Sequence, residues 1–149
     1  MPLPPKPGWI VDYVTARNVF DSNDNQLINF LVGMCGGAEL FCCKCEGKLF
    51  ADHARLKPPF IEDQDCRLKL TAEIVQRLAA LAAMAAQGHF NGKRFLAGDE
   101  STKIIVASAI EHDFGIISNR ANDRFLTVAE VGAACGVLTL TTTQVKQLL

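Results

Sequence analysis

Residues 98–118, GDESTKIIVASAIEHDFGIIS, place a helix directly before a strand. Small and apolar residues predict a helix over Ser101–His112, and the apolar run Phe114–Ser118 predicts the strand that follows it. Two acids, Asp99 and Glu100, stand immediately before the helix. They either cap the helix, because the helix dipole favours acids there, or form part of a metal-binding acidic site.

The same alternation of strand and helix continues on both sides of this stretch. Further strands are predicted at Trp9–Val14, Glu39–Cys43 and Val137–Leu140. Further helices are predicted over about 25–36, 47–56, 67–87 and 128–134, and from about 142 onward; Gly36-Gly37 ends the first and Lys57-Pro58-Pro59 ends the second. Strands separated by helices predict an α/β three-layer sandwich with a mostly parallel central sheet.

The bulk composition indicates an ordinary globular protein. The 149 residues are 49% hydrophobic and 21% charged, which predicts one domain over 9–149 after a flexible Pro-rich lead-in over 1–8. A net charge of −1 excludes a globally basic nucleic-acid binder but leaves room for a local basic patch. The lead-in has no apolar core of a secretory signal, and no apolar run is long enough to span a membrane, so a cytoplasmic location is expected.

Six cysteines require a choice between buried thiols and a metal site. Cys42-Cys43-Lys44-Cys45, with His53 nearby, suggests zinc. Structural zinc sites usually have two ligand pairs, however, and no clear second pair follows. In a strand, Cys42 and Cys43 face opposite ways, which favours reduced cysteines that behave as apolar residues.

Several acids fall where a parallel sheet places its ligand site, outside the carboxyl ends of the strands. Asp12 follows the first strand, Asp52 lies on the helix after the second, and Asp123 follows the strand that ends at Ser118. Converging carboxylates repel one another and need a cation, and oxygen ligands favour Mg²⁺ or Mn²⁺. Each acid also has a simpler interpretation, as a helix cap, a loop residue or a solvated helix residue.

At this point the chain resembles a known family. Ile10-Val11-Asp12, Asn18-Val19-Phe20, CEGKLFADHARLK (45–57), residues 98–118 and GVLTLTTTQVKQLL (136–149) together are similar to PIN-domain ribonucleases, including the toxins of toxin–antitoxin modules. The similarity in element order covers nearly the whole chain and is strongest over Phe95–Leu149.

The resemblance implies a metal-dependent endoribonuclease that hydrolyses RNA phosphodiester bonds with a metal-activated water. It also implies a cognate antitoxin and a homodimer as partners, with no membrane. The implied catalytic acids are Asp12, Asp52, Asp99 and Glu100; the implied metal ligands are Asp12, Asp99, Glu100 and Asp123; the implied substrate-binding residues are Ser118, Asn119, Lys93 and Arg94. For the last two, scattered surface charge is the alternative.

Two departures from the family pattern support a competing function. The family usually continues its first Asp with Thr or Ser and then Asn, whereas this chain has Tyr13-Val14. A shifted register that matches Asn18-Val19-Phe20 better puts Ala16 at the position of the acid, and no acid directly follows Ser118-Asn119. The alternative function is therefore a catalytically inactive PIN-like binding or scaffold module.

Overall fold

The described part of the chain folds around one parallel sheet. The computed structural model describes residues 2–60, 67–88, 100–119, 128, 132, 133 and 135–149. The sheet has five strands in the order β3-β2-β1-β4-β5, and every neighbouring pair is parallel. The strands are β1 (Trp9–Val11), β2 (Leu40–Cys43), β3 (Arg67–Leu68), β4 (Gly115–Ile117) and β5 (Thr139–Leu140). The predicted α/β class with a parallel central sheet is confirmed.

Successive residues of a strand point to opposite faces of the sheet, so the apolar strands have side chains to bury on both faces. Helices cover each face. Trp9 and Val11 of β1 belong to the core that also contains buried residues of α1 (Tyr13–Asp21), α2 (Asn25–Gly36) and α9 (Thr142–Leu148). Ile10 belongs to the opposite core. Alternate residues of β1 thus contribute apolar side chains to the cores on both faces of the sheet.

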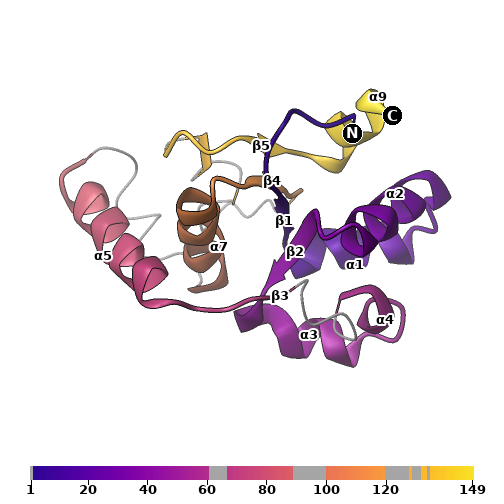
Figure 1. The fold of residues 1–149 in the computed structure, drawn as a ribbon, viewed down its shortest axis with the longest axis horizontal. Helices are drawn as coiled ribbons and strands as arrows, with labels where there is room; N and C mark the ends of the chain where they lie inside the picture. The colour runs from indigo at the N-terminus through magenta and orange to yellow at the C-terminus, as the bar shows by residue number, and fades with distance from the viewer. Residues whose placement is uncertain (1, 61–66, 89–99, 120–127, 129–131, 134) are drawn as a thin grey trace.

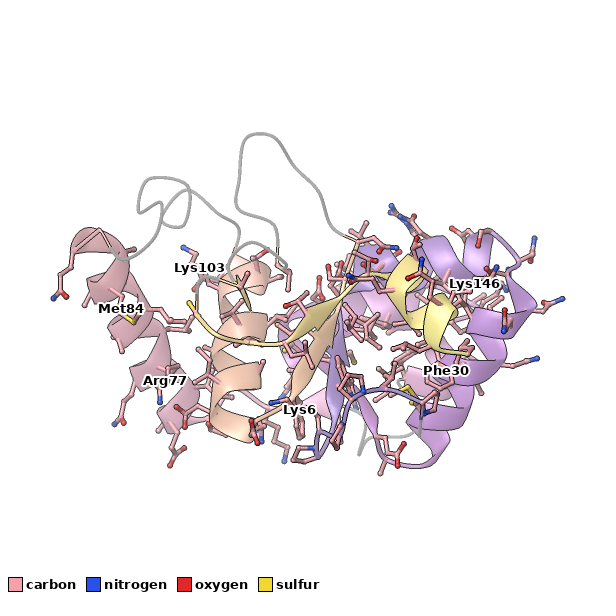
Figure 2. The ribbon with its side chains drawn as sticks, turned by 90° about the horizontal axis from the view of Figure 1, so that it is seen from above. Lys6, Phe30, Arg77, Met84, Lys103 and Lys146 are labelled. Carbon is pink, nitrogen blue, oxygen red and sulfur yellow. The ribbon has the colours of Figure 1, made fainter. Side chains whose placement is uncertain are left out.

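The opposite core is built by α7 (Glu100–His112) and α5 (Ala72–Ala86). Figure 1 shows α7 between the sheet and α5, and Figure 2, seen from above, shows the same arrangement with Arg77 and Met84 on the outer helix. The predicted helix at 101–112 therefore forms a main part of the layer against β1 and β2. None of the helices in these described ranges is long and apolar enough to cross a membrane.

The first predicted strand was too long. β1 ends at Val11, and α1 begins at Tyr13 with Asp12 as its N-cap. The Asp12 side chain accepts the amide hydrogen of Thr15, which satisfies one of the free N–H groups of the first turn. This cap outweighs the strand preference of Tyr13 and Val14.

Two predicted helices are shorter than expected. The helix at 67–87 is divided into β3 and α5, because Thr71 caps α5 through the amide of Ile74 and leaves the preceding residues extended. The helix at 47–56 ends as α3 (Gly47–Asp52), followed by a turn and α4 (Lys57–Phe60). Pro58 and Pro59 lie inside α4 and do not end a helix, because proline is tolerated in a first turn. Most of the predicted helix at 128–134 lies outside the described residues.

The Pro-rich lead-in lies extended against the fold. Leu3 is buried in the core beside α2, and Lys6 Nζ forms an ion pair with Asp113 at 3.0 Å. The backbone at Gly8 passes so close to Phe41 and Phe114 that a Cβ would lie 2.6 Å from the first ring and 3.0 Å from the second. The lead-in is therefore anchored at the amino end of β1.

Candidate functional site

The strand order identifies the carboxyl edge at β1 and β4 as the place for a ligand site. The order reverses between these two strands, because β1 lies between β2 and β4. In open parallel sheets, ligands bind outside the carboxyl ends of the strands at such a reversal. Asp12 directly follows β1 and Ser118 directly follows β4, so both predicted residues lie at this point.

Asp12 is fully buried and holds the start of α1. Its Oδ1 accepts a hydrogen bond from the Thr15 hydroxyl at 2.6 Å, and its Oδ2 accepts the Thr15 amide at 3.2 Å. The same Thr15 hydroxyl oxygen accepts the amide of Asn119 at 2.8 Å. Thr15 therefore fixes the Asp12 carboxylate and connects it to the end of β4.

Glu46 is a second buried carboxylate at this edge, and the sequence analysis missed it. It ends the 3₁₀ turn η1 (Lys44–Glu46) directly after β2, is 3% exposed, and accepts the Tyr13 amide through Oε1 at 3.1 Å. Two carboxylates thus lie at the first turn of one helix. The signal was an acid three residues past a buried strand, but a three-residue 3₁₀ turn has no periodicity that marks it in the sequence.

Asp52, predicted for the position after the second strand, is exposed at the last residue of α3. The buried side chain of that helix is Phe50. The structure thus places the buried carboxylate of Glu46 at the Asp12 edge, while the Asp52 side chain is exposed.

Asn119 joins the carboxyl edge to the C-terminal helix. Its Oδ1 accepts the Thr142 amide at 2.8 Å, and its side-chain amide donates to the Thr142 hydroxyl. Ser118 is 1% exposed, and its amide donates to Leu140 in β5 at 2.9 Å. Both predicted residues lie at the site edge, and Asn119 also holds the start of α9.

The start of α7 lies beside this group. Helix α7 packs against η1. The Glu100 side chain is 73% exposed and lies 3.6 Å from Lys103 Nζ. Asp99, Asp123, Lys93 and Arg94 lie outside the described residues. Within the described residues, no three acid, histidine or cysteine side chains are grouped so that they could hold a metal ion.

The alternation of the strand correctly predicts that Cys42 and Cys43 point to opposite faces, but it does not predict the exposure of Cys45. Cys42 and Cys43 are buried in opposite cores, whereas Cys45 is exposed. The hydrogen bond from Cys43, together with one from Ser101, lowers the pKa of Cys45 to about 7. The same pairing, together with burial, raises the pKa of Cys43 well above its usual range.

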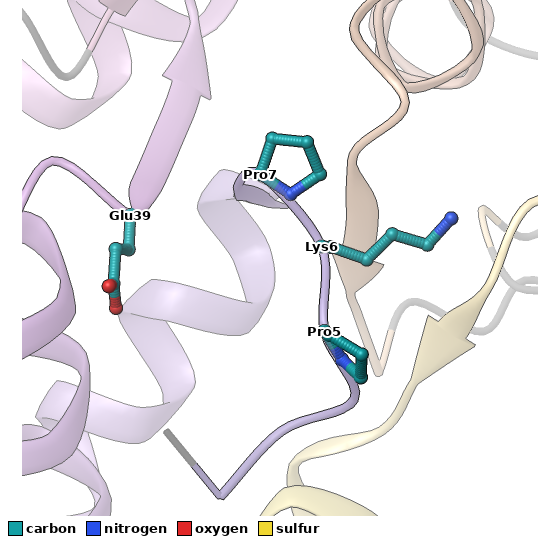
Figure 3. Close-up of a pocket in the computed structure, with 4 residues that line it drawn as sticks. All are labelled: Pro5, Lys6, Pro7 and Glu39. Atoms are coloured by element: carbon teal, nitrogen blue, oxygen red, sulfur yellow. The ribbon is translucent and has the colours of Figure 1, made fainter.

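A pocket lies at the opposite edge of the sheet. An open pocket of about 450 Å³ is lined by Pro5, Lys6, Pro7 and Glu39, next to the amino ends of β1 and β2. Figure 3 shows Lys6 pointing away from Glu39. Its Nζ pairs with Asp113 at 3.0 Å. Because its charged groups do not converge, this pocket has no evident chemistry despite its size.

Comparison with known proteins gives no family for this chain. No protein-family model matches it, and no curated protein matches its sequence.

Proposed function

We propose that this protein is a metal-dependent endoribonuclease of PIN type whose site lies at the carboxyl edge of β1, β2 and β4. The observation that carries the proposal is the pair of buried carboxylates, Asp12 and Glu46, at the first turn of α1. The choice of RNA as substrate is supported by the sequence resemblance.

The charge at this helix start favours a bound cation. In their ionised forms the two carboxylates carry two negative charges, whereas a helix N-terminus offers roughly half a positive charge. The Asp12 carboxylate accepts hydrogen bonds from the amide and the hydroxyl of Thr15, which is neutral. A divalent ion bound to both carboxylates would offset part of this negative charge.

A second N-cap in the same molecule provides a contrast. Asp24 caps α2 through the Leu27 amide, and Lys146 Nζ lies 2.8 Å from its other oxygen. That cap has a lysine as its counter-ion, whereas the Asp12 cap has a second acid nearby. The sequence thus places like charges together at α1 and opposite charges together at α2.

The residues present suit a hard cation. Carboxylate oxygens are the ligands that Mg²⁺ and Mn²⁺ prefer. Asp12 and Glu46 would hold the ion, with an acid from the start of α7, Asp99 or a reoriented Glu100, as the third ligand. When bound, the ion would activate a water and stabilise the charge that develops on the phosphodiester. Thr15 keeps the Asp12 carboxylate in place, and Ser118 and Asn119 offer polar groups beside it.

The partners follow from the same proposal. A cognate antitoxin is proposed as the protein that neutralises the nuclease, and a homodimer as its oligomeric state. Lys93, Arg94 and Asp123 remain predictions from the sequence, the first two for RNA phosphates and the third as an outer metal ligand.

RNA cleavage tests this proposal. Fluorophore-labelled single-stranded and hairpin RNAs are incubated with the full chain and Mn²⁺, with Mg²⁺, or with EDTA. Cleavage is expected with either metal and is expected to be lost in EDTA, in Asp12→Asn and in Glu46→Gln. Glu39→Gln, at the amino edge, is the matched control and should cleave like the wild type.

The inactive binding module is the second candidate, and one observation favours it. The Glu100 side chain is 73% exposed and lies 3.6 Å from Lys103 Nζ, whereas Asp12 and Glu46 are buried. RNA that binds equally to the wild type and to Glu46→Gln, with no metal-dependent cleavage, would support the module and contradict the nuclease.

A further inference from the structure

An arginine lies over an aromatic ring at the same helix start as the two buried carboxylates. Tyr13 is the first residue of α1, directly after Asp12, and Arg17 follows it by four residues. Residues four apart share one face of a helix, and the Arg17 guanidinium carbon lies 5.6 Å from the centroid of the Tyr13 ring. Both residues are half-buried, so solvent and solutes reach them. A positive charge therefore lies at the rim of the acidic edge.

The Tyr13 side chain is a fixed support for this charge. Its backbone amide donates to Glu46 Oε1 at 3.1 Å, which ties the residue to a proposed metal ligand. Its ring meets the fully buried Phe50 ring edge to face, with the two centroids 5.5 Å apart. A guanidinium held over such a ring loses less freedom when it binds a ligand.

The acid in position to neutralise Arg17 pairs with another residue. Asp21 lies four residues further along α1, the usual spacing for an ion pair on a helix. Its Oδ1 lies 3.1 Å from His53 Nε2. Within the described ranges of the chain, no acid forms an ion pair with Arg17. An aromatic ring attracts the charge of a guanidinium without using its N–H donors, so these donors remain available to an anion.

Arg55, near the other end of α1, provides a contrast. Its guanidinium carbon also lies over an aromatic ring, 5.8 Å from the centroid of Phe20. One of its nitrogens, however, donates to the Phe20 carbonyl, and to Asn23 Oδ1 at 2.9 Å. Arg55 thus holds the end of the helix, whereas the described part of the structure gives Arg17 the ring contact alone.

We propose that Arg17, supported by Tyr13, binds a phosphate of the RNA strand that flanks the phosphate at Asp12 and Glu46. This inference rests on the proposed function and adds a subsite to it. A guanidinium pairs with phosphate oxygens through two N–H groups, and its positive charge favours the approach of a polyanion to an acidic edge. Arg17 contacts the substrate in this arrangement, and Tyr13 is a positioning residue that acts through Arg17.

RNA binding without cleavage tests the subsite. A fluorescein-labelled single-stranded RNA is titrated with the full chain in EDTA, and fluorescence anisotropy gives the affinity at several KCl concentrations. In Arg17→Met the slope of log K against log[KCl] should become about 0.7 less negative, which is the share of one phosphate contact on a single strand. At about 0.1 M KCl this change corresponds to an affinity about fivefold lower.

Arg77→Met is the matched control for this measurement. It removes the same charge from α5 in the opposite layer, where Arg77 pairs with Glu111, and its salt slope should equal that of the wild type. The loss in Arg17→Met should be the same for purine-rich and pyrimidine-rich RNA, because a phosphate contact carries no sequence information. A loss confined to one of the two sequences would overturn the assignment to a phosphate.

Two variants of Tyr13 test the supporting role of the ring. Tyr13→Phe keeps the ring and should bind RNA like the wild type. Tyr13→Leu removes the ring but leaves the charge of Arg17, and it should weaken binding about two- to fivefold, the effect of one exposed cation–π contact. Urea unfolding checks that both variants keep the fold. A folded Tyr13→Leu protein with wild-type affinity would overturn the role of the ring.

The subsite and the nuclease can fail separately. An unchanged affinity and salt slope in Arg17→Met would overturn the subsite, and so would a wild type that binds no RNA in EDTA. Cleavage with Mn²⁺ is a separate measurement. Binding that depends on Arg17 without any cleavage would support the subsite and contradict the nuclease. Cleavage by the wild type together with unaffected binding by Arg17→Met would do the reverse.

Discussion

The amino and carboxyl edges of the sheet are formed by the same strands, but the side chains at the two edges differ in polarity. At the amino edge the contacts are mainly aromatic: Phe41 and Phe114 stack with centroids 4.9 Å apart, and Gly115 lies against the Trp9 ring. At the carboxyl edge Asp12, Glu46 and Ser118 are buried polar groups.

The difference shows why pocket size is a poor guide here. The 450 Å³ pocket lies at the amino edge, where Lys6 pairs outward with Asp113. The carboxyl edge holds buried carboxylates, which cost free energy unless other groups or a ligand compensate them. Helices also begin at this edge, so their free N–H groups draw acids to it. Charge and burial therefore favour the carboxyl edge for the proposed site, whereas volume alone would favour the amino edge.

The largest stability effect is expected from Gly115→Ala at the amino edge. An added Cβ would lie 2.4 Å from the Trp9 ring, and Trp9 is fully buried and has no room to move. Overpacking of this kind is expected to lower the free energy of unfolding by about 1–3 kcal/mol, measured by urea unfolding.

Gly33→Ala on α2 is the matched control for that measurement. Nothing lies within 4 Å of a Cβ at this position. Alanine in a helix is expected to stabilise by about 0.5–1 kcal/mol relative to glycine. Equal effects of the two substitutions would contradict the described packing of Trp9.

At the carboxyl edge, Thr15→Val should have the next largest effect. It removes the hydroxyl that donates to Asp12 and accepts from the Asn119 amide. Leaving those groups unpaired is expected to cost about 1–3 kcal/mol, toward the lower end because Asn119 is exposed. Thr15→Ser keeps the hydroxyl and should recover most of the loss in the same urea measurement. A loss as large in Thr15→Ser would show that the methyl group, and not the polar network, matters.

The smallest effect is expected at Asp24, the N-cap of α2, whose carboxylate pairs with Lys146. The hydrogen bond from Lys146, followed by that from the Leu27 amide, lowers the pKa of Asp24 below its ordinary value of 3.8. A lowered folded-state pKa means that this stabilisation is present above about pH 4 and is lost as the pH falls through the lowered value.

Lys146→Met should therefore raise the pKa of Asp24 back toward 3.8, measured by NMR titration of its carboxyl carbon. Lys6→Met, which breaks the ion pair with Asp113, is the control and should leave Asp24 unchanged. If the pKa of Asp24 does not change in Lys146→Met, Lys146 is not its effective counter-ion, and the contrast with the Asp12 cap is lost.

Local sequence patterns predicted much of the fold. Each difference between the predicted and the observed elements has a physical cause. The apolar runs at Trp9–Val11 and Gly115–Ile117 and the spaced apolar residues of α2 predicted the layers, because burial on two faces imposes them. The start of α1 was missed because its caps come from Asp12 and from distant Glu46.

The site was predictable only in part for the same reason. Asp12, Ser118 and Asn119 follow strands directly, so their place at the carboxyl edge follows from the strand pattern. Glu46 reaches that edge through a short 3₁₀ turn, and its bond to Tyr13 joins residues 33 positions apart. No periodicity in the sequence marks such a contact, whereas the helical pattern around Asp52 predicted an acid on the helix after the second strand.

Direct titration with Mn²⁺ tests the central claim, that Asp12 and Glu46 form a cation site at the carboxyl edge. Isothermal calorimetry on the reduced wild type should show saturable binding. Affinity should fall by about tenfold or more, equivalent to about 1.4 kcal/mol, in Asp12→Asn and in Glu46→Gln, and should be unchanged in Glu39→Gln. A wild type that binds no Mn²⁺ at millimolar concentrations, or binding that Glu46→Gln leaves intact, would contradict the account.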